Sequence, residues 1–91
     1  MKSKQTMQDN VKEFINVVKR ELIDCNVLND YRQHLFNLSK RFKINIYFYN
    51  GSNTINTLGG NLNVFINKNQ PIVTIKSKLI TLLNKYLLDN K

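Results

Sequence analysis

The sequence has few of the side chains on which cross-linking and catalysis depend. Its 91 residues include one cysteine, Cys25, one histidine, His34, one proline and no tryptophan. A single cysteine cannot form an internal disulfide, and a metal site would need more His, Cys and carboxylate ligands than this chain contains. We therefore expect a protein without a cofactor in a reducing compartment, which we take to be the cytoplasm.

Long hydrophobic runs are also absent. The leucine-rich stretch at residues 79–88 is interrupted by Thr81, Asn84 and Lys85, whereas a helix that crosses a bilayer needs about 20 consecutive apolar residues. Residues 1–5 contain no apolar run that could serve as a signal peptide. We expect no association with a membrane.

Catalytic motifs are missing as well. No acidic residue follows His34 until Asp89, and we interpret His34 as a partly buried histidine on a helix. Cys25 has no base near it in the sequence. The Gly59-Gly60 pair lacks the flanking Gly and Lys-Ser/Thr of a phosphate loop and is better interpreted as a turn. We therefore expect a protein that is not an enzyme.

Acidic side chains are almost confined to the first third of the chain. Residues 1–30 contain five basic and five acidic residues, whereas residues 31–88 contain eight Lys and Arg and no Asp or Glu. The cations of the longer stretch are Arg32, Lys40, Arg41, Lys43, Lys68, Lys76, Lys78 and Lys85. No carboxylate is there to cancel them, so a fold that exposes them has a positive surface suited to phosphate or to a carboxylate-rich partner.

The chain does contain enough apolar side chains for a core. Hydrophobic residues make up 42% of the sequence, as in globular rather than disordered chains. The length fits a single domain, residues 1–91. Fifteen asparagines accompany eleven lysines and nine isoleucines, a composition that we interpret as codon bias.

Two antiparallel helices are predicted at the start of the chain. The first covers residues 9–24, capped by Thr6 or Asp9; its apolar residues recur every three or four positions, at Met7, Val11, Phe14, Ile15, Val18 and Leu22. The second, capped by Asn29 or Asp30, has the same spacing at Leu28, Tyr31, Leu35, Leu38 and Phe42.

A sheet and a last helix are predicted to follow. Residues 44–49 and 61–67 alternate apolar and polar side chains, a weaker strand covers residues 54–56, and another covers residues 72–75. Asn50-Gly51 indicates a tight hairpin turn, and Ser77 indicates the start of the final helix. The predicted fold is α+β: a helical hairpin, a three- or four-stranded antiparallel meander and a C-terminal helix, with the helices packed on one face.

A basic cluster next to aromatic residues is the first candidate binding site. Lys40, Arg41 and Lys43 directly precede the strand that carries Tyr47 and Tyr49. Cations neutralise phosphates and aromatic rings stack on unpaired bases, a combination that single-strand binders use. The alternative is an ordinary solvated helix end, where cations suit the helix dipole, with the tyrosines covered by a helix.

The start of the last predicted helix is the second candidate site. Lys76 and Lys78 flank Ser77, so free backbone amides and two ammonium groups would face a phosphate together. The order of helix, strands and helix, with basic residues at this position, resembles that of domains that bind double-stranded RNA, which implies contacts with RNA phosphates. The alternative is that lysine is simply frequent in this chain.

The outer face of the second predicted helix is a third candidate. Arg32 lies off its apolar stripe, together with Gln33, Phe36, Asn37, Lys40 and Arg41. A helix of this kind followed by a hairpin resembles part of a winged helix-turn-helix domain, which implies contacts with DNA. Phe36 is either a second buried edge or an anchor for a protein partner.

These features predict a small basic protein that binds nucleic acid, with RNA or a single strand favoured over duplex DNA. Its expected contacts are Arg32, Lys40, Arg41, Lys43, Tyr47, Tyr49, Lys76 and Lys78. The alternative is a compact inhibitor or adaptor whose basic face covers an acidic or nucleic-acid-binding surface of another protein. A homodimer is also left open, through the second helix or a strand edge at residues 72–75.

Overall fold

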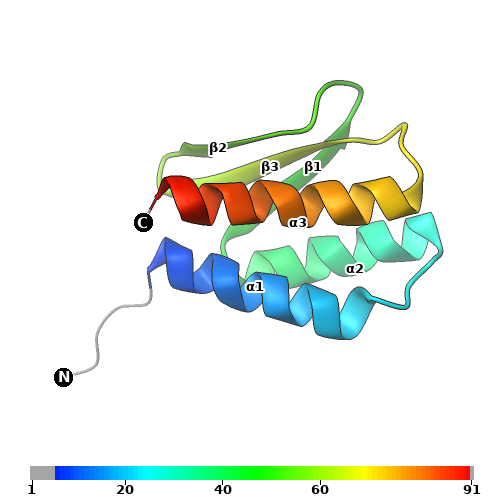
Figure 1. Ribbon diagram of the computed structural model, residues 1–91, viewed down its shortest axis with the longest axis horizontal. Helices are drawn as coiled ribbons and strands as arrows, with labels where there is room; N and C mark the ends of the chain where they lie inside the picture. The colour runs from blue at the N-terminus through cyan, green and yellow to red at the C-terminus, as the bar shows by residue number, and fades with distance from the viewer. Residues whose placement is uncertain (1–5, 91) are drawn as a thin grey trace.

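Two helices, three strands and a final helix follow one another along the chain (Figure 1). The computed structural model describes residues 6–90. Its elements are α1 (Met7–Leu22), α2 (Leu28–Arg41), β1 (Ile44–Tyr49), β2 (Thr54–Leu58), β3 (Asn61–Asn67) and α3 (Ile72–Asp89). The α+β class, the N-terminal helical hairpin and the C-terminal helix are confirmed.

The first helix begins with a side-chain cap and the second does not. Thr6 accepts a hydrogen bond from the backbone N–H of Asp9, whose carboxylate accepts one from the backbone of Thr6, so a capping box starts α1. Helix α2 begins after Val27 with no side-chain cap. The predicted caps Asn29 and Asp30 are wrong, because both residues already lie in the first turn.

The sheet is mixed, and the predicted antiparallel meander is wrong. The strand order is β1-β3-β2, with β1 parallel to β3 and β2 antiparallel to β3. Gly59 and Gly60 make the tight hairpin, joining Leu58 to its partner Asn61, and their φ angles of 61° and 81° suit the positive-φ turn that hairpins favour. Asn50-Gly51 makes no hairpin, because residues 50–53 carry the chain across the end of β3.

The strand order follows from how much apolar surface each strand offers. In β3, the side chains of Leu62, Val64 and Ile66 are all fully buried. Strand β2 turns only Ile55 and Thr57 to the same side, since they pair with Val64 and Leu62. A meander would put β2 in the centre, whereas the observed order leaves β2, which offers the least apolar surface, at an edge of the sheet.

The predicted fourth strand at residues 72–75 is also wrong, because these residues form the first turn of α3. Pro71 precedes the helix, where its fixed φ and missing N–H cost nothing. Ile75, Leu79 and Leu83 then form a fully buried stripe at a spacing of four. Ile72, Val73 and Thr74 favour a strand by intrinsic propensity. They form a helix because this conformation buries Ile75 in line with Leu79 and Leu83.

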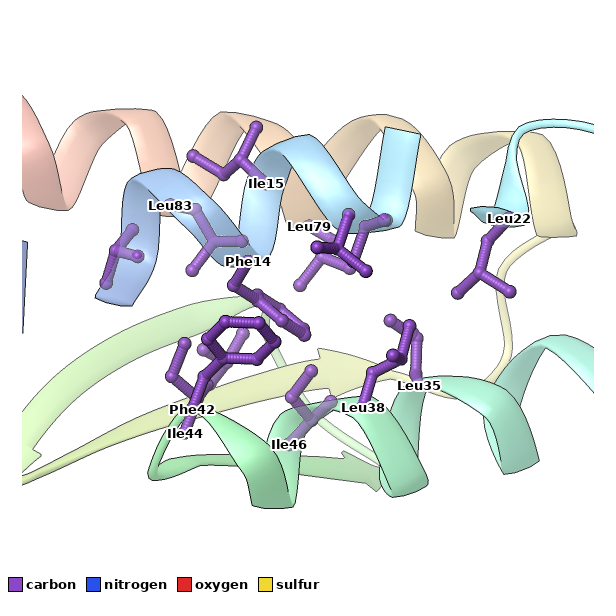
Figure 2. Close-up of a cluster of buried hydrophobic side chains, with 14 of the residues drawn as sticks. Phe14, Ile15, Leu22, Leu35, Leu38, Phe42, Ile44, Ile46, Leu79 and Leu83 are labelled. Atoms are coloured by element: carbon purple, nitrogen blue, oxygen red, sulfur yellow. The ribbon is translucent and has the colours of Figure 1, made fainter. Parts of the chain in front are cut away.

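All three helices lie on one side of the sheet, and the other face has no helix over it (Figure 1). Helix α2 contacts β1, α3 contacts β2 and β3, and α1 packs against α2 and α3. The core between them is closed by Phe14 and Phe42, whose rings are 5.6 Å apart at their centroids (Figure 2). The apolar stripe of α2 is buried in this core, so it is not free to pair with a second copy.

Side-chain amides hold the crossing loop in place. The Asn53 carbonyl oxygen accepts hydrogen bonds from the backbone N–H of Asn67 (2.7 Å) and from the Gln70 amide (3.1 Å), and the Asn53 amide donates to Gln70 (3.0 Å). Asn69 donates to Asn50 at 2.6 Å. Several of the asparagines therefore have a structural role that codon bias alone does not describe.

Candidate nucleic-acid interface

Three aromatic rings lie side by side on the helix-free face of the sheet. Tyr47 on β1 pairs in register with Phe65 on β3, and their rings stack with centroids 5.1 Å apart. Tyr49, two residues further along β1, meets the edge of Phe65 at 5.6 Å. We call these residues the aromatic row. The alternative that a helix covers the tyrosines is wrong, because Tyr47 is 46% exposed and the helices lie on the other face.

A row of amides runs beside the aromatic row. Asn45, Asn63 and Asn56 occupy paired positions on β1, β3 and β2. The Asn45 amide donates to Asn63 at 3.0 Å, and the Asn63 amide donates to Asn56 at 3.2 Å. Each amide has donors and an acceptor, so Asn45 and Asn56, at the ends of the row, retain hydrogen-bonding groups that can face a ligand.

Gly51 makes room for the ring of Tyr49. A Cβ added at Gly51 would lie 2.6 Å from Cε2 of Tyr49, closer than any real contact allows. The Tyr49 hydroxyl donates to the backbone carbonyl of Ser52, so the residues after β1 fix the orientation of the ring. Sequence reasoning used Gly51 for a turn and missed this role, because the close approach depends on the tertiary path of the loop.

A groove runs along the free edge of β1, between this strand and α2. Its volume is about 540 Å³, and it is lined by Asn29, Arg32, Gln33, Phe36, Ile46, Tyr47 and Phe48. Phe36 from α2 is 48% exposed. The guanidinium of Arg32 lies over the Phe48 ring at 4.7 Å, and the Lys40 ammonium lies over the Phe36 ring at 4.1 Å.

The predicted cations do not all gather on this side. Arg32 and Lys40 lie on α2 next to the groove, and Lys43, with a φ of 57°, joins α2 to β1. Arg41 instead lines a hollow between α1 and α2, which Glu21 and Asp30 also line. Arg20 and Glu21, both on α1, form an ion pair at 3.4 Å. Arg32 and Lys40 thus lie at the groove, and Lys43 directly precedes the strand that borders it.

Lys76 and Lys78 do not form the predicted phosphate site. Helix α3 begins at Ile72, so both residues lie in its second turn and Ser77 is not a cap. The Lys76 ammonium donates to the backbone carbonyl of Ile23 at 3.0 Å and to Asn26 at 3.4 Å. The feature on which the likeness to double-stranded RNA-binding domains rested is therefore absent. The likeness to a winged domain also fails, because Asn50-Gly51 makes no hairpin.

Catalytic and metal-binding groups are sparse in the part of the chain that the structure describes. No cluster of three or more His, Cys, Asp or Glu side chains exists within residues 6–90. His34 is exposed, contrary to its prediction, and lies in the hollow between α1 and α2. Across residues 6–90 no helix is both long enough and apolar enough to span a membrane.

Phe65 is the main site residue that sequence reasoning missed. It lies in the centre of the aromatic row and contacts both predicted tyrosines. The sequence did indicate it, because Phe65 alternates with the apolar residues of its strand and so lies on the same face as Asn61, Asn63 and Asn67. An aromatic residue on the polar phase of a strand is a candidate for an exposed stacking surface.

Comparisons with known proteins found no match. No family model, no curated protein and no solved structure is significantly similar to this chain. Any function must therefore be inferred from the geometry and chemistry of the open face and the adjacent groove.

Proposed function

We propose that this protein binds single-stranded nucleic acid on the helix-free face of its sheet, without catalysis. The observation that carries the proposal is the aromatic row, in which Tyr47, Phe65 and Tyr49 lie side by side with no helix over them. Exposed aromatic rings on a sheet are surfaces on which unpaired bases stack. In a duplex the bases are already stacked on one another, so a single strand fits this face better.

Charge around the open face supports a polyanionic ligand. Lys43 directly precedes β1 and Lys68 directly follows β3, so the two cations lie beyond opposite ends of the two parallel strands. Arg32 lines the groove beside β1, and Lys40 lies over the ring of Phe36, which lines the same groove. The three strands themselves contain no charged residue. A strand whose bases stack on the aromatic row can place its phosphates toward these surrounding cations.

RNA is favoured over DNA by the amide row. Asn45 and Asn56 retain donors and acceptors next to the aromatic row. The RNA 2′-hydroxyl is both a donor and an acceptor, so these amides can bind it while the neighbouring base stacks.

The test measures the affinity of oligonucleotides for variants of Tyr47. Replacing Tyr47 by Leu removes the ring and should weaken binding of an unstructured oligouridine about tenfold, within the range found when a stacking ring is lost. Replacing Tyr47 by Phe keeps the ring and should leave the affinity almost unchanged. Oligodeoxyuridine of the same length should bind more weakly than oligouridine, and a duplex more weakly still.

Other outcomes would reject the proposal. If Tyr47→Leu and Tyr47→Phe bind equally well, stacking on the aromatic row does not contribute. If the wild-type protein binds no nucleic acid even at low salt, the function lies elsewhere.

A protein partner is the second candidate function, and one observation favours it. Ile23, Val27 and Val73 are 63%, 59% and 69% exposed. They lie where the α1–α2 connection meets the start of α3, the end that the Lys76–Ile23 hydrogen bond joins. An inhibitor or adaptor could use this apolar end to dock. A stoichiometric partner that survives nuclease treatment, and is lost when Val27 is replaced by Asp, would identify this function.

A further inference from the structure

The groove between α2 and the free edge of β1 has the size and lining of a site for one small flat group. Its volume of about 540 Å³ lies within the range of roughly 300–1,000 Å³ that small-molecule sites occupy. Two exposed rings line it, Phe36 from α2 and Tyr47 from β1. Tyr47 also belongs to the aromatic row, so the groove and the open face share one ring and form a continuous surface around the edge of β1.

The polar groups of the groove fit the edge of a nucleobase and its phosphate. Gln33 and Asn29 line the groove and each carries an amide with donors and an acceptor. Arg32 contributes a planar guanidinium, which is held over the Phe48 ring at 4.7 Å. Guanidinium groups bind phosphate through two parallel hydrogen bonds and also stack on bases. No carboxylate lines this groove, whereas the hollow on the other side of α2 contains Glu21 and Asp30.

We infer that this groove holds one unstacked base of a strand whose neighbouring base lies on Tyr47. The inference rests on the proposed function and adds a second contact region to it. Phe36 provides a face for the splayed base, and Gln33 and Asn29 bind its polar edge. Arg32 binds the phosphate that joins the splayed base to the base on the open face. A strand can follow this path only if consecutive bases point in different directions, so a flexible single strand is required.

The experiment compares oligouridines of increasing length by fluorescence anisotropy. The affinity of the wild-type protein should rise gradually with oligonucleotide length. It should rise by a further step of about tenfold at the length at which the strand reaches the groove as well as the open face. Phe36→Ala should lose this step and keep the wild-type affinity for the shortest oligonucleotides that bind. Leu88→Ala, which removes an exposed apolar side chain from α3, should retain the step.

A second measurement does not depend on the stability of the variant. Ultraviolet cross-linking of the wild-type protein to a long oligouridine should attach uridine to a peptide that contains Phe36. With the shortest oligonucleotides that bind, the cross-links should be confined to the β1 and β3 peptides that carry the aromatic row.

The outcomes separate this inference from the proposed function. If Phe36→Ala keeps the whole length-dependent gain, or if no cross-link reaches α2, the groove holds no base while the open face can still bind. A second copy of the chain could instead occupy the groove. In that case sedimentation would depend on protein concentration and Phe36→Ala would abolish this dependence, and the inference is also rejected. Failure of the wild-type protein to bind any single strand rejects both.

Discussion

Lys76 shows that a cation in a carboxylate-free stretch can serve the fold. Its ammonium donates to the carbonyl of Ile23, the residue that caps the C-terminal end of α1, and it lies 5.6 Å from the centre of the Tyr31 ring. Carbonyls at a helix C-terminus lack intrahelical partners and carry partial negative charge, so a cation there is stabilising. The sequence pattern could not separate this lysine from those that face solvent, because the carbonyl that it binds lies 53 residues away.

We predict that Lys76→Ala lowers the free energy of unfolding by about 1 kcal/mol, because a charged hydrogen bond to a helix end is lost. Urea unfolding followed by circular dichroism measures the change. Lys78→Ala, which removes an exposed cation two residues further along α3, is the control and should leave the stability almost unchanged. An equal effect of both substitutions would show that general charge, and not the contact with Ile23, is responsible.

Tyr31 makes the stability of the fold depend on pH in the alkaline range. Its side chain is 1% exposed, and burial, with a smaller contribution from Cys25, raises the pKa of its hydroxyl above the ordinary value of 10.0. The folded protein therefore keeps this proton at a pH at which the unfolded chain loses it. The stabilisation is fully present below pH 10.0 and is lost as the pH rises further.

We predict that the free energy of unfolding falls above pH 10.0 and that Tyr31→Phe removes this part of the decrease. Lysines titrate in the same range, so the informative quantity is the difference between the two proteins at each pH. Tyr47→Phe, a change on the open face, should retain the wild-type decrease. A Tyr31→Phe profile parallel to that of the wild type would contradict the assignment.

Among the elements, the β2–β3 hairpin and the β1–β2 loop depend on glycine for different reasons. Gly59 and Gly60 have positive φ and open space around them, so they are needed for backbone conformation. Gly51 is needed for space, because a Cβ there would meet the Tyr49 ring. The first requirement concerns the fold and the second concerns the candidate interface.

We predict that Gly59→Ala and Gly60→Ala each lower the free energy of unfolding by about 1–2 kcal/mol, the cost of a left-handed backbone for an alanine. Gly51→Ala should change the stability less, but it should displace the Tyr49 ring and weaken oligonucleotide binding. Thermal unfolding and anisotropy, measured on the same three variants, separate the two effects. A Gly51→Ala protein with wild-type affinity would show that the position of Tyr49 is not important.

The prediction of secondary structure succeeded where a local pattern was supported by the core and failed where it was not. Strands 44–49 and 61–67 are confirmed, because alternation in both segments corresponds to one covered and one open face. Residues 72–75 have β-branched side chains typical of a strand, yet Ile72, Ile75, Leu79 and Leu83 have the spacing of a helix. If the apolar helical spacing had been extended towards the N-terminus as far as Pro71, the start of α3 would have been predicted correctly.

At the scale of the whole molecule, the excess of positive charge is divided among several surfaces. Arg32 and Lys40 lie at the groove, Lys43 directly precedes β1, Arg41 lines a hollow with two acidic residues, and Lys76 is hydrogen-bonded to the end of α1. The net charge of +8 therefore overstates the charge available to one ligand.

We predict that about four phosphates are neutralised, so the logarithm of the affinity for a single strand should fall against the logarithm of salt concentration with a slope of roughly −3. Arg32→Gln and Lys43→Gln should each reduce the steepness of this slope by about 0.7. Lys85→Gln on α3 loses the same charge outside the interface and should keep the wild-type slope. A slope close to zero for the wild type would remove the electrostatic part of the proposal.

The sequence by itself determined the two N-terminal helices, the strands β1 and β3 and the sign of the net charge, because these follow from the spacing of apolar residues and from the count of ionisable groups. Only the tertiary structure decided the strand order, the hydrogen bond from Lys76 to the C-terminal end of α1 and the meeting of Tyr47, Phe65 and Tyr49 on one uncovered face. Each of these depends on which surfaces the core covers. That choice is made by apolar area summed over residues far apart in the chain, and no local pattern contains it.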